Sequence, residues 1–311
     1  MKSGALLDAR SRQPPIGDLR VNAIVIGQTI VSGLLLGGIF ALVAVGLTLI
    51  FGVMKILNFA HGDFLMLGMY FAFFLSVMFG IDPYLSVFAA LPLFFGLGWL
   101  IQSYLIRPIL KAPENIQILL TVGLSLFLQN FALYLFSPDF QSLRVSYGGN
   151  TLSIMGVSIS YVRLVASLVA IGASLGLYIF LARTDIGKAL RACAEERLGS
   201  MAVGINVDRM YNIAFGLGIS CVALAGILMT PFFYIAPQVG LPFTLTAFVV
   251  AVLGGLGSLP GALIGGLIIG LIESLGEIFL PSPSMKQMAT FTVFLLILLL
   301  RPQGLFGGKL A

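Results

Sequence analysis

Asn58, His61 and Asp63 stand close together in otherwise almost unbroken apolar sequence, and His61 is the only histidine of the chain. An ionisable side chain at membrane depth costs roughly 2.5 to 3.5 kcal/mol on insertion scales, so such residues usually line a cavity, pair with one another or lie at a bend. Three roles are open for this polar run: contact with a substrate, a gate or hinge, and a structural turn. In the turn, Asn58 or Asp63 would cap a helix beginning at Phe64. Catalysis by the histidine is not expected, because no nucleophile or metal-ligand pattern is near it.

Two further pairs of polar residues interrupt apolar sequence. Glu273 and Glu277 lie one helical turn apart. Deep burial would require these carboxylates to pair with a basic group or to line a path, whereas a place near the membrane surface would leave Glu277 in water. Gln129 and Asn130 pose the same choice, and hydrogen bonding between helices is the simpler explanation for them.

Charged residues gather in residues 183–209, which hold nine of the 29 charged side chains of the chain (17 basic and 12 acidic). Within this stretch, residues 186–196 can form a short helix that is followed by Gly199 and Gly204. A short helix bounded by glycines suits docking into a groove of another protein, and a solvated loop is the alternative. The phosphate-binding pattern G-x-x-x-x-G-K-[ST] is absent from the sequence, so energy from ATP would have to come from a partner.

The chain that carries these residues is very apolar. It has 311 residues, of which 59% are hydrophobic and 9% charged, and its mean hydropathy is +1.07. Soluble domains have about 25% charged residues, so the composition predicts an integral membrane protein built as a helical bundle. The basic residues behind the net charge of +5 are spread over a tail and several loops; they are expected to set orientation, not to bind nucleic acid. Cys193 and Cys221 have no framework spacing, so no disulfide, metal or cofactor is expected.

Hydropathy predicts an all-α fold, a polytopic transmembrane bundle of about 8 to 10 crossing or re-entrant helices. The clearest spans are 84–106, 116–136, 161–182, 211–231 and the short 288–300. Residues 22–54 are too long for one ordinary span and residues 243–257 are too short. Splitting the first near Gly37 and Gly38 gives about ten crossings. Keeping the two regions as a long tilted helix and a re-entrant element gives about eight.

Orientation follows from the basic residues, which are enriched in short cytoplasmic loops. Residues 183–210 are therefore predicted to be a cytoplasmic loop, and the polar run at 57–63 is predicted at the cytoplasmic end of a helix. Residues 1–21 are read as a cytoplasmic N-terminal arm, because the following apolar stretch outruns a signal-peptide core and lacks a cleavage site. Residues 22–311 form a single transmembrane domain, and the split of residues 22–54 places both termini in the cytoplasm.

Glycine spacing suggests close helix packing and a weak internal repeat. The small-xxx-small pairs are Gly33/Gly37, Gly172/Gly176, Gly261/Gly265 and Gly266/Gly270. Such pairs let helix backbones approach closely, and packing is a simpler reading of them than a role in transport. Residues 39–79 and 243–280 each contain a helix, a glycine-containing break and a second helix. Interrupted segments in two halves of a chain point to a transporter's substrate path.

Three stretches together resemble the permeases of branched-chain amino acid ABC transporters. They are GGIFALVAVGLTLIFGVMKILNFAHGDFLMLGMY at 37–70, GKALRACAEERLGSMAVGINVDR at 187–209 and GGLGSLPGALIGGLIIGLIES at 254–274. The resemblance covers nearly the whole chain after Asn22, and of the two permease types in these systems it is closer to the H-type. It implies a non-enzymatic importer half in the bacterial inner membrane that pairs with a second, similar permease, giving a heterodimer. Two cytoplasmic ATPase subunits and a periplasmic binding protein complete such systems.

The resemblance also implies roles for individual residues. Residues expected to transmit closure of the ATPases are Arg191, Glu195, Glu196 and Gly204. Residues that match polar positions of the family, and so are candidates for the translocation path or a gate, are Asn58, His61, Asp63 and Glu273. The EAA signature of other importers is present only loosely, at 194–196.

The substrate, the energy source and the class of protein each have alternatives. Members that resemble this chain serve branched-chain amino acids, other amino acids, urea, amides and aromatic acids. An ion-coupled secondary transporter would place ionisable residues near the bilayer centre, whereas the candidates here are expected closer to loops. A membrane-embedded enzyme would need a catalytic cluster, and neither H-E-x-x-H nor G-x-S-x-G occurs.

Overall fold

The computed structural model describes residues 23–154, 156–279, 283–301 and 303–306, and the predicted arm at 1–21 lies outside these ranges. Within them the helices are joined by loops, and the one sheet is an antiparallel hairpin of β1 (Thr151–Ile154) and β2 (Val157–Ser160). The helices are α1 (Ala23–Met54), α2 (His61–Phe79), α3 (Val87–Ile101), α4 (Glu114–Phe136), α5 (Tyr161–Arg183), α6 (Asp185–Glu195), α7 (Arg197–Ala202), α8 (Val207–Met229), α9 (Gly240–Gly254), α10 (Leu259–Phe279) and α11 (Pro283–Leu300). The all-α bundle is thereby confirmed.

Seven helices in the described ranges are long and apolar enough to cross a membrane: α1, α2, α3 with its continuation to Ile109, α4, α5, α8 and α10. Beyond Ile101, α3 continues as a π-helical turn (Gln102–Ile106) and a 3-10 turn (Arg107–Ile109). α9 and the apolar part of α11 are shorter. These nine helices fall within the predicted range, and the short one predicted at 243–257 is α9.

The predicted split of residues 22–54 is wrong, because α1 is one helix of 32 residues. Its glycines serve packing and not a break. A Cβ added to Gly37 would lie 2.8 Å from the Cα of Leu267 on α10, and one added to Gly38 would overlap the hydroxyl of Ser167 on α5. Side chains larger than hydrogen at these positions would push the neighbouring helices away from α1.

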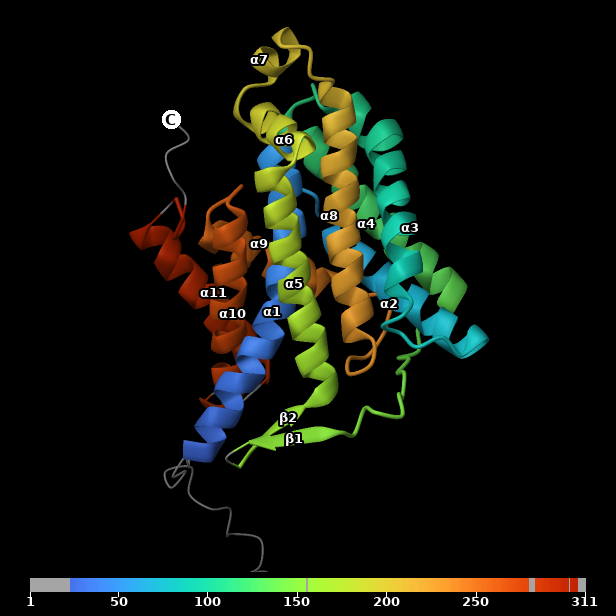
Figure 1. Ribbon diagram of the computed structural model, residues 1–311, viewed down its shortest axis with the longest axis vertical. Helices are drawn as coiled ribbons and strands as arrows, with labels where there is room; N and C mark the ends of the chain where they lie inside the picture. Colours follow the sequence, from blue (N-terminus) through green and yellow to red (C-terminus); the bar gives the residue numbers. More distant parts are fainter. Residues whose placement is uncertain (1–22, 155, 280–282, 302, 307–311) are drawn as a thin grey trace, which may run out of the picture.

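The two described ends of the chain lie at opposite ends of the bundle. Near the start of α1, Gln28 exchanges two hydrogen bonds with Ser158 of the hairpin. At the other end, beside α6 and α7, the backbone of Leu305 donates to the carbonyl oxygen of Leu253 (Figure 1). The prediction of two cytoplasmic termini depended on the split of α1 and is not confirmed.

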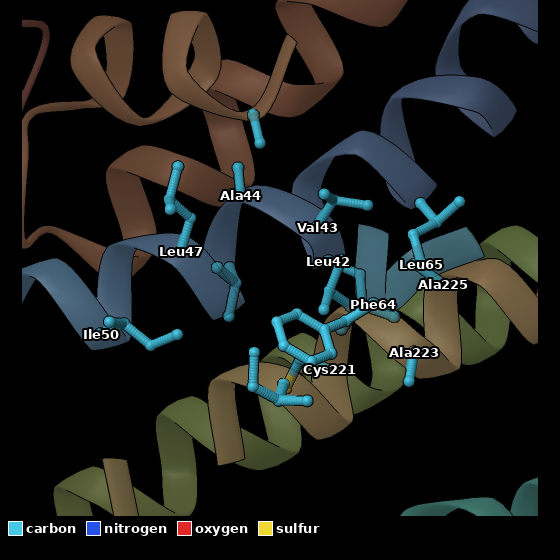
Figure 2. Packing of buried hydrophobic residues seen from close by; sticks show 14 of the residues in the cluster. Leu42, Val43, Ala44, Leu47, Ile50, Phe64, Leu65, Cys221, Ala223 and Ala225 are labelled. Atoms are coloured by element: carbon cyan, nitrogen blue, oxygen red, sulfur yellow. The ribbon is translucent and has the colours of Figure 1, made fainter. Parts of the chain in front are cut away.

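The core lies where α1, α2 and α8 cross. Phe64 of α2 is fully buried and lies between Leu42 of α1 and Cys221 of α8, as Figure 2 shows. Nearly every residue of α8 is buried, which explains why its sequence is apolar on all sides. α3, α4 and α5 expose large apolar side chains instead, as expected of helices that face lipid.

The end of the bundle that carries the hairpin is tied together by two tyrosines. The hydroxyl of Tyr147 donates to Asp82 at 2.7 Å, and that of Tyr84 donates to the carbonyl oxygen of Val162 at 2.9 Å. Burial raises the pKa of both phenols above the ordinary value. Both therefore remain protonated donors, which holds the start of α5 against the connection between α2 and α3.

Candidate functional site

The polar run lies beside the middle of α1 and not at its end. The Nε2 atom of His61 is 2.9 Å from the carbonyl oxygen of Val43, about 16 Å along the axis from the last residue of α1 at a rise of 1.5 Å per residue. A carbonyl oxygen only accepts, so Nε2 carries the proton and donates. Residues 55–60 therefore turn back into the bundle, where the carbonyl oxygen of Leu57 accepts from Thr121 of α4. His61 therefore does not lie at the end of the preceding helix as predicted, because the chain re-enters the bundle before α2 begins.

The starts of α2 and α9 meet at this depth. The backbone N–H of Gly62 donates to the hydroxyl of Thr244 at 2.8 Å. A Cβ added to Gly62 would overlap the carbonyl oxygen of Gly240, and one added to Gly240 would lie 2.6 Å from the carbonyl carbon of Gly62. Glycine is required at both positions because the two backbones touch. We call this meeting of residues 58–63 with the start of α9 the polar crossing.

Asp63 joins the polar crossing to α4. Its Oδ1 accepts from the side-chain amide of Gln129 at 3.0 Å, and the same amide nitrogen lies 3.0 Å from the hydroxyl of Ser125. Interhelical hydrogen bonding is thus confirmed for Gln129, whereas Asn130 bonds only the carbonyl oxygen of Leu126 in its own helix.

Neither Asn58 nor Asp63 caps α2, contrary to the prediction. α2 begins at His61 and not at Phe64, its first position is preceded by Ala60, and no side chain caps it. Asn58 instead accepts from the backbone N–H of Ala60 at 3.2 Å, which closes a local turn before the helix. Asp63 faces α4 because helix formation starts two residues ahead of it.

Several buried polar atoms near the polar crossing have no hydrogen-bond partner within the ranges that the structure describes. They are Nδ2 of Asn58, Nδ1 of His61, Oδ2 of Asp63 and Oγ1 of Thr48. The first three residues are at most 1% exposed. A buried polar atom without a partner costs about 1–3 kcal/mol. This region therefore holds more polar atoms than its own hydrogen bonds satisfy.

Glu273 lies away from the polar crossing. It is half-buried on α10, next to Ser274, whose hydroxyl donates to the carbonyl oxygen of Thr29 at 2.9 Å. Thr29 and Val43 are separated by about 20 Å along α1. Glu273 and Glu277 each take part in an interaction of their own. The structure therefore does not bring Glu273 together with Asn58, His61 and Asp63.

The predicted short helix in the charged segment is confirmed as α6. The hydroxyl of Thr184 caps it by accepting from the backbone N–H of Gly187 at 3.0 Å. Leu190 and Cys193 form its buried face, and burial raises the pKa of the Cys193 thiol. Arg191 donates to the carbonyl oxygen of Leu181 at the end of α5. α6 is therefore fixed to the bundle along one side.

The other residues predicted for coupling have separate roles. Glu195 lines a cavity of about 240 Å³ together with Lys55 and Arg191, between α6, α1 and the turn before α10. Glu196 caps α7, since its carboxylate accepts from the backbone N–H of Leu198 at 3.1 Å. Gly204 has a φ of 84°, the left-handed region that favours glycine, and closes the turn after α7.

The sequence interpretation missed an apolar tip on α7. Leu198, Met201 and Val203 are 74%, 54% and 76% exposed, respectively, at the far end of the bundle from the hairpin (Figure 1). Exposed apolar groups that cluster beyond a fixed helix mark interaction surfaces. The sequence does contain an indication of this surface, because Leu198, Met201 and Val203 are apolar residues close together in a charged stretch. We call α6, α7 and the following turn to Gly204 the coupling segment.

Comparison with known proteins identifies the family. A family model described as branched-chain amino acid transport system / permease component matches residues 29–300. The high-affinity branched-chain amino acid transport system permease protein LivH of Escherichia coli strain K12 is 35% identical over 293 residues, covering 90% of this chain and 95% of the relative. The corresponding protein BraD of Pseudomonas aeruginosa is 34% identical over 294 residues, with 90% and 95% covered.

An archaeal relative extends the similarity. The probable branched-chain amino acid transport permease protein LivH of Methanocaldococcus jannaschii is 30% identical over 304 residues, covering 93% of this chain and 94% of the relative. No solved structure matches the chain. The matched region includes α2 to α11 and most of α1, so the polar crossing and the coupling segment both lie inside it. This multi-pass membrane protein belongs to the branched-chain amino acid transport system permease family.

Proposed function

We propose that this chain forms one transmembrane half of an ATP-driven importer of branched-chain amino acids in the inner membrane of a bacterium. The observation that carries the proposal is the family match over residues 29–300, which spans the bundle and the coupling segment together. In this proposal a second permease supplies the other half of the path. Two cytoplasmic ATPase subunits and a periplasmic binding protein supply energy and substrate.

The coupling segment receives the ATPase subunit at its apolar tip. α6 is fastened to α1 and α5 through Leu190 and Arg191, so a push on α7 is carried to the helices that reach the polar crossing. Effectors shift a transporter between states only through contacts that differ between those states. Closure of the ATPases would therefore act through the position of α6 against the cavity that Glu195 lines.

The polar crossing acts as a hinge between α2 and α9. Backbone contact between Gly62 and Gly240 leaves no room for side chains, and several buried polar atoms there have no hydrogen-bond partner among the described residues. A change in the angle between the two helices that pairs those atoms would be favourable. The hinge does not require the substrate to touch His61.

Reconstitution of the complete complex tests the proposal. Vesicles that hold both permeases and the ATPases, supplied with binding protein and ATP, are expected to accumulate leucine, isoleucine and valine. ATP hydrolysis is expected to rise with the same substrates. Failure of all three amino acids while urea, an amide or an aromatic acid stimulates hydrolysis would overturn the substrate assignment.

One observation favours a second candidate, ion-coupled transport. His61 and Asp63 are ionisable residues beside the middle of α1, the depth at which coupling residues of secondary transporters lie. Uptake by vesicles that contain the permeases without ATPases, driven by a proton gradient and abolished by a protonophore, would support this candidate and contradict the ATP-driven one.

A further inference from the structure

A second cavity of about 240 Å³ lies at the end of the bundle that carries the hairpin. It is formed by α1, the start of α5, the segment after α8 and the end of α10, and the proposed orientation places it on the outer side of the membrane. Its walls include Ser32, Leu36, Ile39, Arg163, Phe233 and Glu277. The cavity thus combines one cation, one anion, the hydroxyl groups of Ser32 and Ser274, and an apolar wall.

The two charged residues come from different helices. Arg163 lies in the first turn of α5, and its guanidinium is 5.6 Å from the centre of the Phe232 ring, which holds the cation at the cavity. Glu277 lies in the last turn of α10. Both residues are exposed, and Glu277 also takes part in an interaction within the protein, so an ammonium group would add to the contacts of its carboxylate. Guanidinium groups bind carboxylates through paired hydrogen bonds, and a carboxylate accepts several bonds from an ammonium group.

The apolar wall leads inward to an aromatic barrier. Ile39 is 1% exposed and lies one helical turn before Val43, the partner of His61. Phe233 makes an edge contact with Phe243 at 5.5 Å between ring centres, and Phe40 is 6.1 Å from Phe243. Phe233 lines the cavity and Phe243 belongs to the first turn of α9, so these ring contacts join the cavity wall to the start of α9. A molecule in the cavity would be separated from the polar crossing by this barrier.

Two simpler explanations exist. Both charges could be solvated surface groups, or Arg163 could bind the phosphate of a lipid. A lipid phosphate would account for a cation alone. A purely anionic head group would be repelled by the carboxylate in the same cavity, and a zwitterionic head group with its own ammonium would occupy the cavity whether or not leucine is added. A small molecule with a carboxylate, an ammonium group and an aliphatic side chain matches all three types of wall at once.

We propose that this cavity is an outward-facing subsite for the zwitterionic aliphatic amino acid, with Arg163 binding its carboxylate and Glu277 its ammonium group. The side chain of the amino acid then packs on Leu36, Ile39 and Phe233. The subsite rests on the proposed function, because it names how the transported amino acid would be held after delivery and before it passes the aromatic barrier.

Cysteine protection in the complete permease–ATPase complex tests the subsite directly. Cys193 and Cys221 are buried and are replaced by Ala, and Ser32→Cys is introduced in the cavity wall. A membrane-impermeant thiol reagent is added outside the vesicles, without binding protein. Leucine is expected to slow the reaction, whereas isoamylamine and 4-methylpentanoate, which each lack one of the two charges, are not. Ser153→Cys, on the hairpin outside the cavity, is expected to react equally fast with and without leucine.

Charge variants sharpen the test. Arg163→Gln and Glu277→Gln are each expected to raise the leucine concentration for half protection at least tenfold. Arg163→Lys keeps a cation without the paired geometry and is expected to raise it less. Arg144→Gln, which removes an exposed cation outside the cavity, is expected to leave it unchanged. The unfolding temperature of every variant is measured alongside to establish that the complex is folded.

Two outcomes separate this proposal from the proposed function. If the complex imports leucine normally with Arg163→Gln and no amino acid protects Ser32→Cys, the subsite is overturned and the importer stands. If leucine is not imported but a different amino acid protects the cysteine in a manner that depends on Arg163 and Glu277, the subsite stands and the substrate assignment is wrong.

Discussion

The polar crossing and the coupling segment are both polar interruptions of an apolar chain, yet they are built in opposite ways. At the polar crossing, Asn58 and His61 are fully buried and Gly62 touches the backbone of α9. In the coupling segment, Leu198 and Val203 are about three-quarters exposed. The first region uses polar groups and glycine to position helices, and the second uses apolar groups to offer a surface.

The difference in burial assigns a different role to each region: the polar crossing positions helices, and the coupling segment offers a surface to a partner. A buried crossing tolerates little change in volume, because protein interiors are close-packed. Substitutions at the exposed apolar tip are expected to leave folding intact but to weaken binding of a partner. Variants in the crossing are therefore expected to act on stability first, and variants in the tip on assembly with the ATPases first.

The largest expected effect is at Gly240. Gly240→Val would place side-chain atoms against the carbonyl group of Gly62, where only a shift of the backbone makes room, so we expect a loss of stability of about 3 kcal/mol, the upper end of the usual cost of overpacking. Thermal unfolding of the purified chain in detergent measures it. Gly123→Val is the matched control, because an added Cβ there meets nothing within 4 Å. Equal unfolding temperatures would show that the crossing is loosely packed.

Charges at the apolar tip are expected to have the next largest effect, on transport alone. Leu198→Asp combined with Val203→Asp should reduce ATP-driven uptake by the complete complex at least tenfold, because each change would bury an unpaired charge in an apolar contact with the ATPase. The unfolding temperature of the isolated chain should stay the same. Leu152→Asp on the exposed hairpin serves as control. Normal uptake by the double variant would exclude the tip as a docking surface.

Variants of Asp63 test whether its carboxylate is needed only for hydrogen bonding within the bundle or also for transport. Asp63→Asn keeps an oxygen that accepts from Gln129, whereas Asp63→Ala leaves that buried amide without its partner and should cost about 1–3 kcal/mol of stability. Chemical unfolding of both variants compares them. If Asn abolishes ATP-driven uptake as completely as Ala does, the negative charge itself is needed for transport and the role of Asp63 is more than structural.

The smallest expected effect is at the cap of α7. Glu196→Ala removes the acceptor for the backbone N–H of Leu198, which should cost about 1 kcal/mol locally. Hydrogen exchange of the α7 amides should speed up several-fold while exchange in α8 is unchanged. Glu196→Asp retains an acceptor and should show little change. Glu195→Lys, by contrast, should alter coupling without altering α7 exchange.

The sequence was sufficient to predict the helical bundle, the short helix α6 and the family. It was insufficient for the depth of His61, because hydropathy records how apolar a segment is and not whether the chain turns back into the bundle after α1. The split at Gly37 and Gly38 failed for a related reason: glycine in a membrane helix permits close packing as often as it marks a break, and only the position of α10 decides between the two.

The roles of the paired glutamates were also beyond sequence reasoning. Glu195 and Glu196 are adjacent in the chain, but the helix ends between them, so one lines a cavity and the other caps the next helix. Helix ends are uncertain by a residue or two in any sequence-based prediction. A one-residue shift in that boundary would exchange their roles.

A cross-link from the apolar tip tests the central claim, that energy enters through the coupling segment from a separate ATPase. Met201→Cys, 54% exposed in the native chain, is labelled with a benzophenone in the assembled importer and illuminated with and without ATP. We predict a product that contains the ATPase subunit and whose yield changes when ATP is bound. An importer that retains ATP-driven uptake but forms no such product, while the same label at Leu152→Cys does, would contradict the account.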